Sequence, residues 1–506
     1  MDIFDNVIAG FSSALSATKL MYCFFGVFMG MMMGVLPGIG AMATISMLLP
    51  VTFYVAPDVG LIMLAGIYYG AQYGGSISSI LLNLPGTPSS AVICLDGYPM
   101  TKANRAGPAI FLTTMASFFG SMFAILLLFT VAPLAAKLAL SFGASEYFAL
   151  MILGLVAAAS LAQHGIMRGL AMVVVGLMLG LVGSDVTSGT FRMTMGILDL
   201  ADGFSIIAMA MGLFGVAEIM SNLAGTTGAT MLTSKIKLRD LVPTRQDLRQ
   251  FSAPAARGGI IGAILGILPG TGASIASFVS YGFEKRISRT PHKFGTGHVP
   301  GIVAPEAANN SAAQSAFIPT LTLGVPGDAV MALMMSALII HGIQPGPTVI
   351  TDHPDLFWGL VASFVIGNVI LLILNLPLIG LWVRLLLIPY RFLYPVIIVL
   401  ICVGVFSVGN SQFDVLQVIF FGFVGYGMKL VRLEPAPLVL GFVLGPLLEE
   451  NFRRALILSR GDIAVFVEHP ISASLLVACL AIILFSIRGE HARPKRENET
   501  PAPGDT

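Results

Sequence analysis

Charged residues are scarce in this chain. Asp, Glu, Lys and Arg make up 10% of its 506 residues, against about 25% in an average soluble protein. A soluble fold of this length could not cover its surface with so few charges. Because 56% of the residues are apolar and the mean hydropathy is +0.89, the sequence predicts a polytopic membrane protein.

Several functional classes lack their sequence signals. The net charge of +1 gives no overall field that would attract nucleic acid. The four cysteines are isolated in apolar runs, a pattern that predicts neither a disulfide framework nor a zinc site. The chain has no G-x-x-x-x-G-K-[ST] motif for nucleotide hydrolysis and no H-E-x-x-H motif. We therefore expect no resident cofactor, and energy for any transport would come from an ion gradient or from a partner.

The apolar runs predict the architecture. A straight membrane crossing takes about 20 apolar residues, whereas the runs at 20–57 and 59–95 are longer and contain Pro and Gly. These runs must contain broken helices or hairpins. We predict an all-α membrane protein with about 12 transmembrane helices, some broken or re-entrant, arranged as two inverted-topology repeats.

Basic residues in short loops indicate sidedness. The segments 98–108 and 232–257 are basic and predicted to be cytoplasmic, whereas 341–356 has no Lys or Arg and is predicted to be periplasmic. Arg453, Arg454 and Arg460 fall where strict alternation would place the periplasm. Either the alternation fails there or the short run 435–448 does not cross.

An internal repeat supports two halves. Residues 34–41 (GVLPGIGA) recur at 266–273 (GILPGTGA), with six of the eight positions identical. Two further landmarks follow each copy in the same order: GGS at 74–76 and LPGT at 84–87 correspond to NNS at 309–311 and VPGD at 325–328. Duplication explains this shared order better than chance.

The charges around the two copies differ. Basic segments flank 258–283 on both sides, so this stretch is predicted to enter and leave at the cytoplasmic face, with its tip at 268–272. Residues 52–60 in the first copy have no basic residue, as a periplasmic flank would. This is the charge pattern of an inverted repeat, although one kinked crossing of 258–283 remains an alternative.

The resulting domain plan has four parts. Residues 1–231 form the first membrane repeat, 232–257 a cytoplasmic basic linker, 258–487 the second membrane repeat, and 488–506 a disordered polar tail, which we expect in the cytoplasm.

These landmarks resemble the large membrane subunit (TctA type) of the bacterial tripartite tricarboxylate transporters. The resemblance rests on 34–41, on 66–76 (GIYYGAQYGGS), on 83–88 (NLPGTP) and on the Pro269 and Pro326 regions, and it extends from about Met21 to about Leu456. It implies an importer of di- or tricarboxylates such as citrate, coupled to Na⁺ or H⁺. It also implies two partners, a small membrane subunit (TctB type) and a periplasmic solute-binding protein (TctC type), and location in the bacterial inner membrane.

The Pro-Gly segments are the candidate substrate site. A break in a membrane helix exposes backbone N–H groups and a positive dipole end, which suit an anion, and freed carbonyls, which suit a cation. Small polar residues lie beside the breaks and could donate to a carboxylate, or could simply help helices pack. The candidate substrate-binding residues are Pro37, Gly38, Gly40, Gly74, Gly75, Ser76, Pro85, Gly86, Thr87, Pro269, Gly270, Thr271, Gly272, Asn309, Asn310, Ser311, Pro326 and Gly327.

Two acids are candidates for cation coupling. Glu306 and Asp328 lie in or next to apolar segments, and an acid inside a membrane is a functional candidate. Glu306 could instead lie at a water interface. Asp96, near Lys102, is expected to be an ordinary loop residue. Whether the protein binds a metal ion is left open.

Three kinds of function are compared. A secondary transporter fits two mirrored halves around one site. An ion or organic-anion channel without gradient coupling is the alternative, although channels more often build their pore from several subunits. An enzyme is not predicted, because no nucleophile and base lie at a convincing spacing.

Overall fold

The computed structural model describes residues 3–36, 40–160, 165–185, 188–224, 238–269, 271–386 and 390–491. Within these ranges the chain is almost wholly helical, and the one sheet is the pair β1 (Gly183–Ser184) and β2 (Phe191–Arg192). The all-α class is therefore confirmed. Five helices are long and apolar enough to cross a membrane: α2 (Ala17–Val35), α6 (Ala106–Ala139), α18 (Pro354–Asn375), α21 (Gln412–Leu430) and α24 (Pro470–His491).

The first half begins with a helical hairpin. The chain leaves α2, continues as α3 (Gly40–Leu48) and η1 (Leu49–Tyr54), and then enters α4 (Pro57–Leu82). α2 and α3 contact each other. Lys19 at the start of α2 forms a 2.6 Å ion pair with Asp58 at the start of α4. The hairpin therefore enters and leaves at one end of the molecule.

The second half begins in the same way. α12 (Ser252–Ile267) and α13 (Gly272–Ile287) pack against each other and against α14 (Val299–Ser315). Near the mouth of this hairpin, the Arg257 guanidinium donates to both carboxylate oxygens of Glu284, at 2.9 and 2.6 Å. The predicted hairpin at 258–283 is thus present, and a single kinked crossing does not describe this geometry.

The helices that follow the hairpins, α4 and α14, run antiparallel. Ser76 and Glu306 are in contact near the middle, and Tyr68, nearer the start of α4, contacts Asp328, which lies beyond the end of α14. At the other end, Asp96 in α5 (Cys94–Lys102), which follows α4, contacts the residues that begin α14. Because each hairpin opens beside the start of its helix, the two hairpins open at opposite ends of the molecule.

Cross-packing joins the two halves reciprocally. α6 packs on α14 while α18 packs on α4. Likewise, α13 packs on η2 (Pro88–Ile93), and α3 packs on α16 (Ala329–Ile340). Each half therefore completes the surroundings of the other half's hairpin, and the two hairpins and their following segments form the centre of the protein.

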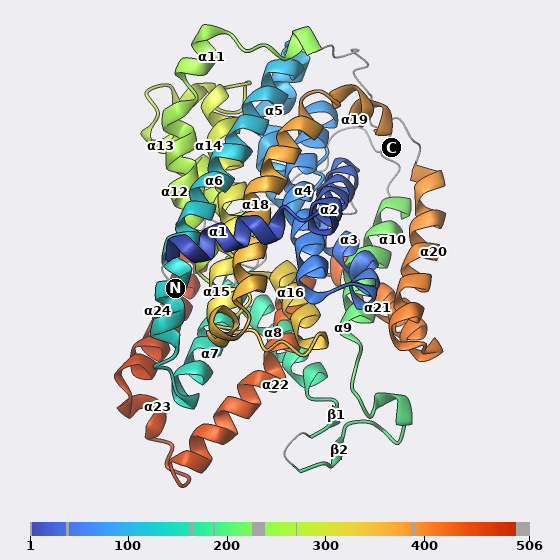
Figure 1. The fold of residues 1–506 in the computed structure, drawn as a ribbon, viewed down its shortest axis with the longest axis vertical. Helices are drawn as coiled ribbons and strands as arrows, with labels where there is room; N and C mark the ends of the chain where they lie inside the picture. The colour runs from blue at the N-terminus through green and yellow to red at the C-terminus, as the bar shows by residue number, and fades with distance from the viewer. Residues whose placement is uncertain are drawn as a thin grey trace.

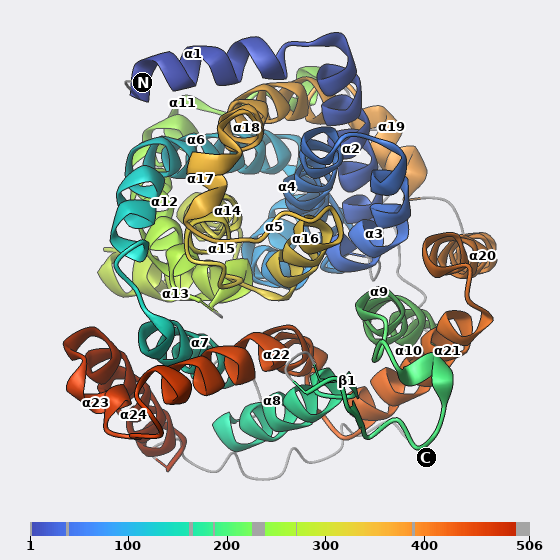
Figure 2. The ribbon, with the colours of Figure 1, turned by 60° about the horizontal axis from the view of Figure 1, so that its bottom comes forward.

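Two outer groups of helices flank this centre, as Figure 2 shows. Each group combines helices from both halves of the chain. One group contains α7 (Ala144–Ser160), α8 (Ile166–Gly180), α22 (Pro435–Leu458) and α24; the other contains α9 (Ile206–Ala210), the π-helical η4 (Met211–Val216), α10 (Ala217–Ala224), α20 (Tyr390–Gly409) and α21.

The short elements complete the chain. Near the N-terminus, α1 (Ile3–Ala14) lies across α18 (Figure 1). The remaining helices are η3 (Leu198–Leu200), η5 (Leu238–Leu241), α11 (Arg245–Arg249), η6 (Pro291–Lys293), α15 (Phe317–Thr322), α17 (Thr348–Asp352), α19 (Ile379–Leu385) and α23 (Val465–Glu468).

The predicted cytoplasmic segments lie at one end. Arg105 pairs with Asp247 of α11 at 2.6 Å, which brings 98–108 next to the basic linker. Figure 1 shows α5 and α11 at the top and β1 and β2 at the bottom. Residues 225–231 at the end of the predicted first repeat, 232–237 of the linker and 492–506 of the tail lie outside the described residues. α24 continues to His491, past residue 488, where we placed the start of the tail.

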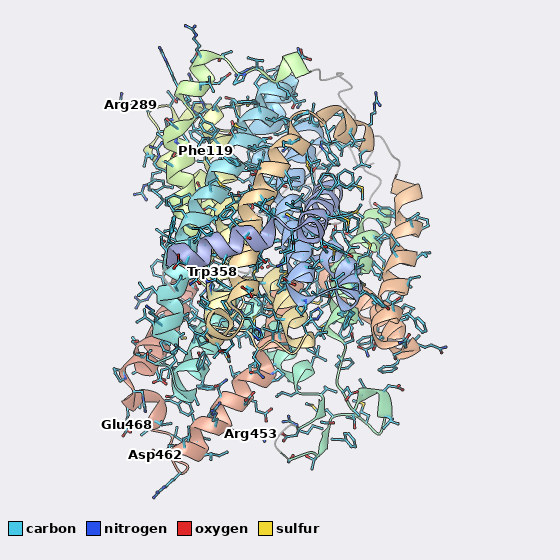
Figure 3. All side chains as sticks on the ribbon, viewed as in Figure 1. Phe119, Arg289, Trp358, Arg453, Asp462 and Glu468 are labelled. Atoms are coloured by element: carbon cyan, nitrogen blue, oxygen red, sulfur yellow. The ribbon has the colours of Figure 1, made fainter. Side chains whose placement is uncertain are left out.

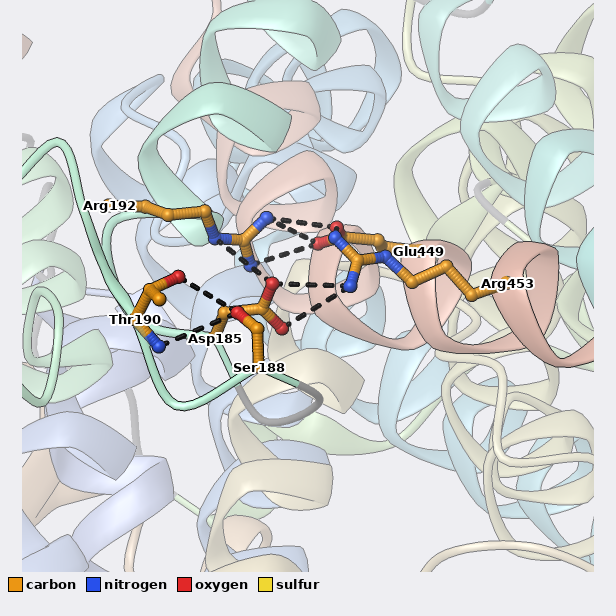
Figure 4. Close-up of polar contacts among 6 residues, drawn as sticks. All are labelled: Asp185, Ser188, Thr190, Arg192, Glu449 and Arg453. Atoms are coloured by element: carbon orange, nitrogen blue, oxygen red, sulfur yellow. Dashed lines mark hydrogen bonds and ion pairs between the residues drawn. The ribbon is translucent and has the colours of Figure 1, made fainter.

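The arginines of α22 lie at the opposite end from α11. α22 is one continuous helix of 24 residues, about 36 Å long, and it extends ten residues past the end of the apolar run at 448. Arg453 pairs with Asp185 at 3.1 Å and with Glu449 at 2.5 Å, and Arg192 also pairs with Glu449, at 2.9 Å (Figure 4). Acid partners therefore offset the charge of Arg453.

Candidate functional site

Both hairpins break at the repeated motif. α2 and α12 end at Val35 and Ile267, and α3 and α13 begin at Gly40 and Gly272. Gly40 and Gly272 have φ values of +65° and +61°, a conformation that glycine adopts without strain. The breaks are thus equivalent in position, and the glycine that begins the second helix of each hairpin has the same backbone conformation. Of the predicted site residues, Pro37, Gly38 and Gly270 lie outside the described residues.

The first break touches the second landmark of its own half. A methyl group on Gly86 would overlap the Gly34 carbonyl oxygen and would come within 2.6 Å of the Gly75 Cα. Three glycines thus let the end of α2, the middle of α4 and the segment before η2 meet closely. Because a side chain at Gly86 has no room, this contact depends on glycine.

The second break has a matching contact with different chemistry. A Cβ atom added to Gly272 would lie 3.2 Å from the Cβ of Asp328, which follows Pro326 and Gly327. Thr271 donates its hydroxyl to the Leu268 carbonyl at 2.9 Å and so satisfies one carbonyl freed by the break. Pro269 is buried and would meet a methyl group on Gly154 of α7 at 3.3 Å.

A polar cluster lies between α4 and η2. The Ser89 hydroxyl donates to the Gln72 amide oxygen at 2.7 Å, and the Thr87 hydroxyl lies 3.3 Å from the same oxygen. Thr87 is also the N-cap residue of η2, and its N–H donates to the Ser90 hydroxyl at 3.2 Å. Thr87, Ser89 and Ser90 are buried, so neutral donors and acceptors are concentrated beside the first break.

Glu306 lies at the junction of three helices and is fully buried. Ser76 of α4 donates to one carboxylate oxygen at 2.6 Å, and Ser117 of α6 donates to the other at 2.7 Å. The Asn310 amide donates to that second oxygen at 3.0 Å and to Ser117 at 2.9 Å. Each of these hydrogen bonds comes from a neutral group, and within the described ranges no basic side chain pairs with Glu306.

Asp328 is placed differently. It is the N-cap of α16, where its carboxylate accepts the Met331 N–H at 2.9 Å, and it also accepts the Tyr68 hydroxyl at 2.6 Å. The N-terminal dipole of α16 stabilises the ionised form. Asp328 is partly exposed, whereas Glu306 is sealed. The two acids therefore differ in access to water although both contact α4.

α14 also carries carboxamides without partners. Among the described residues, neither amide atom of Asn309 or Gln314 has a hydrogen-bond partner, and the Asn310 oxygen has none. All three side chains are fully buried. Native proteins rarely leave such groups unpaired, so they are candidates to bind water, a cation or a substrate.

Some predicted residues have packing contacts instead. A methyl group on Gly74 would overlap the Met31 carbonyl of α2, and the Ser311 hydroxyl donates to the Gly259 carbonyl of α12 at 2.7 Å. Gly327 is buried against Ala316, and Pro85 is exposed. These positions support the close helix packing that small residues allow.

The prediction for Asp96 was wrong. Asp96 is fully buried rather than a loop residue. Its carboxylate accepts the backbone N–H groups of Gly295, Gly297 and His298 at 2.7–3.1 Å and the Tyr281 hydroxyl at 3.0 Å. A carboxylate that accepts several N–H groups is well stabilised, so Asp96 fixes α5 to the start of α14.

Tyr68 and Ser117 were missed. Neither lies in a Pro-Gly motif, and Ser117 comes from α6, outside both repeat landmarks. In the described part of the chain, no group of three or more His, Cys, Asp or Glu side chains could hold a metal ion. Among these residues, cation binding would therefore need hydroxyl, amide or backbone oxygens as well as a carboxylate.

Comparison with known proteins agrees with this architecture. Residues 20–440 match the Tripartite tricarboxylate transporter TctA family. The chain belongs to this family. It is therefore related to the membrane subunits of tripartite tricarboxylate transporters, and the resemblance noted in the sequence is confirmed.

Two relatives come from Agrobacterium vitis. An uncharacterised 52.8 kDa protein encoded 3′ of ttuC′ in the TAR-I region is 50% identical over 487 residues, 96% of this chain and 97% of the relative. An uncharacterised protein from the corresponding TAR-II region is 55% identical over 226 residues, 45% of this chain and 93% of the relative. No solved structure matches the chain.

Proposed function

We propose that the protein is the large membrane subunit of a tripartite secondary transporter that imports di- or tricarboxylates together with Na⁺ or H⁺. Membership in the TctA family supports this proposal. The observation that carries it is the pair of broken hairpins, which open at opposite ends and pack on α4 and on α14, two central helices that contact each other. Two mirrored halves around one site are typical of transporters that alternate between two facing states.

The two halves are proposed to be inverted repeats. The equivalent breaks, the antiparallel α4 and α14 and the reciprocal packing of α6 and α18 support this. Other pairs would follow from the same symmetry, such as η2 and α16, which both begin at a capping residue, Thr87 or Asp328. Movement of one outer group relative to the centre could then open each hairpin mouth in turn.

The substrate site is proposed at the helix starts beside the breaks. α13 begins at its N-cap Thr271 without a side-chain cap, so its first N–H groups can face an anion, and we extend this role to the equivalent start of α3 at Gly40. α16, by contrast, already has the Asp328 carboxylate at its N-terminus. We therefore assign the carboxylates of the substrate to the starts of α3 and α13 and to the hydroxyl groups around Thr87.

Glu306 and Asp328 are proposed to couple the cation. A fully buried carboxylate in a membrane protein is costly unless a proton or cation neutralises it. The hydroxyl oxygens of Ser76 and Ser117 beside Glu306 could contribute to a Na⁺ shell, or the same acid could carry a proton. Asp328, which is partly exposed beside the second break, would bind or release the cation on the solvent-accessible side of the cycle.

Location and partners follow from the same proposal. The end that carries α5 and α11 is basic, so we place it in the cytoplasm of the bacterial inner membrane. α24 runs parallel to α7, since their starts are joined by Ser472 and Ser145 and their later parts line one cavity. The C-terminal tail would then be cytoplasmic.

A periplasmic solute-binding protein (TctC type) would deliver substrate at the end with β1 and β2, and a small membrane subunit (TctB type) would complete the complex.

The test is uptake of labelled carboxylates into proteoliposomes that contain this chain and its two proposed partners. Accumulation against a gradient that requires the binding protein and either Na⁺ or a proton gradient would support the proposal. Flux that follows only the substrate gradient, or single-channel currents, would support the channel alternative.

A further inference from the structure

An apolar groove lies on the outer flank of the protein, away from the hairpin breaks. It is lined by α6, by α12, by Leu248 of α11 and by Phe251 between α11 and α12, and its volume is about 690 Å³. Figure 3 shows Phe119, one of its lining residues, on the flank of α6. The lining is almost wholly apolar: Phe111, Leu112, Met115, Phe119, Met122, Phe123, Leu126, Leu248, Phe251, Ser252, Ala255, Ala256 and Gly259.

The shape of the groove depends on specific contacts. Phe251 meets Phe119 edge to face, with ring centroids 5.7 Å apart, and so closes one wall. Gly259 leaves space opposite Phe123, because a Cβ atom there would already lie 3.8 Å from that ring. The Arg105–Asp247 ion pair holds α11 against the start of α6. The groove is therefore a built feature of the fold rather than a gap between mobile side chains.

The groove is longer than one leaflet of a bilayer and shorter than the whole hydrocarbon core. The lining residues of α6 run from Phe111 to Leu126, which is about 22 Å of helix at 1.5 Å per residue. The hydrocarbon core is about 30 Å thick, so one leaflet takes about half of it. A transmembrane helix about 10 Å wide would occupy roughly 2,000 Å³ over the full core, far more than the groove holds. An acyl chain fits these dimensions better than a helix.

The basic end of the groove carries two exposed arginines. Arg245 and Arg249 of α11 lie three residues before and one residue after the groove-lining Leu248, and both are exposed. In the described part of the structure, neither has an acidic partner, whereas Arg105 and Arg257 nearby are each paired with an acid. Arginine binds phosphate well because its planar group can donate two parallel hydrogen bonds.

We propose that this groove binds an anionic phospholipid, with an acyl chain along α6 and α12 and the phosphate at Arg245 and Arg249. The site is separate from the proposed transport pathway and does not depend on the transported substrate. Charge complementarity selects the headgroup, and the apolar lining selects the chain. Arg105 and Arg257 are each paired with an acid. Arg245 and Arg249 of α11 are therefore the groups that bind the phosphate.

The experiment uses the full chain purified in detergent and native mass spectrometry. Phosphatidylglycerol and phosphatidylcholine with identical acyl chains are titrated in parallel. We expect phosphatidylglycerol to bind more tightly, and Arg245→Gln/Arg249→Gln to reduce its affinity by about an order of magnitude while binding of phosphatidylcholine stays unchanged. Arg454→Gln/Arg460→Gln at the other end is the control and should change neither.

A second variant tests the groove itself. Ala256 is exposed and lines the groove, so Ala256→Phe should fill it without disturbing the core and should weaken binding of both lipids. The proposal would be overturned if the two lipids bound equally. It would also be overturned if Arg245→Gln/Arg249→Gln left binding of phosphatidylglycerol unchanged, or if Ala256→Phe left binding of both lipids unchanged. Competition by free glycerol phosphate as effective as by the lipid would also overturn it, since the site would then recognise only a phosphate. So would a partner helix found in the groove in the assembled complex.

Discussion

The Ser76 hydroxyl and the Glu306 carboxylate lie 2.6 Å apart although 230 positions separate them in the chain. Ser76 belongs to the GGS landmark of the first half, and Glu306 precedes the NNS landmark of the second. This contact joins the two antiparallel helices at their centre. It places an acid that can bind a cation or a proton on the boundary between the two proposed repeats.

Replacing Glu306 tests the coupling role. Glu306→Gln keeps the size of the side chain but removes its negative charge. We expect the variant to insert and bind substrate, but to lose the dependence of uptake on Na⁺ or on pH, with a rate at least tenfold lower. Uptake measured over a range of Na⁺ concentrations and pH values would show this. Glu450→Gln, at an exposed position of α22, is the matched control and should behave like the wild type.

The charge of Asp328 and its role as the N-cap of α16 can be tested separately. Asn is as good an N-cap as Asp, so Asp328→Asn should preserve α16 and leave the thermal stability within about 1 kcal/mol of the wild type. If the charge couples the cation, the variant should raise the concentration of cation needed for half-maximal uptake by an order of magnitude. Tyr68→Phe, which removes the 2.6 Å hydrogen bond but keeps the charge, should have a smaller effect in the same direction. An unchanged cation requirement in both variants would remove Asp328 from coupling.

Gly86 tests the contact between the first break and η2. Gly86→Ala places a methyl group against the Gly34 carbonyl and the Gly75 backbone, which must then move apart. We expect a loss of stability of about 1–3 kcal/mol, as for overpacked cores, together with a large loss of uptake. Thermal unfolding in detergent and transport assays measure the two effects. Gly427→Ala in α21, where a methyl group meets no atom within 4 Å, is the control and should be as stable as the wild type or more so.

The contact between Arg105 and Asp247 holds α11 against α6. It should depend on the charge of Asp247, and therefore on pH. Burial alone would raise the pKa of Asp247, but hydrogen bonds from Arg105 and Thr244 outweigh it and lower the pKa below its usual value. The contact therefore stabilises the folded state fully above the unfolded pKa of about 3.9 and loses this contribution as the pH falls through the folded pKa. Hydrogen exchange of α11 at pH 7 should be several-fold faster in Asp247→Asn than in the wild type. Equal protection of the two proteins at pH 7 would contradict this account.

Local backbone chemistry explains what the sequence predicted well. The hairpin breaks follow from Pro and Gly, whose effects on a helix are confined to a few residues, and the repeated motif marked both of them. The shared position of the basic segments 98–108 and 232–257 could be predicted because basic residues in short loops gather on one side of a membrane. α22 was predicted less well, because a charged stretch after residue 448 does not end the helix when Asp185 and Glu449 pair with Arg453.

Long-range partners explain what the sequence could not predict. The environment of Glu306 depends on Ser117, 189 positions away on α6, which lies in neither repeat landmark. Asp96 has Lys102 near it in the sequence, but its partners are backbone N–H groups about 200 positions away. Such contacts appear only once the packing of α4, α6 and α14 is known.

The most direct test of the central claim is a cryo-electron microscopy map of the transporter complex with a bound carboxylate. The account predicts density for the ligand at the centre, with its carboxylate groups within hydrogen-bonding distance of the backbone amides at the starts of α3 and α13 and near Thr87. Ligand density elsewhere, with both helix starts turned toward lipid or toward protein side chains, would contradict it.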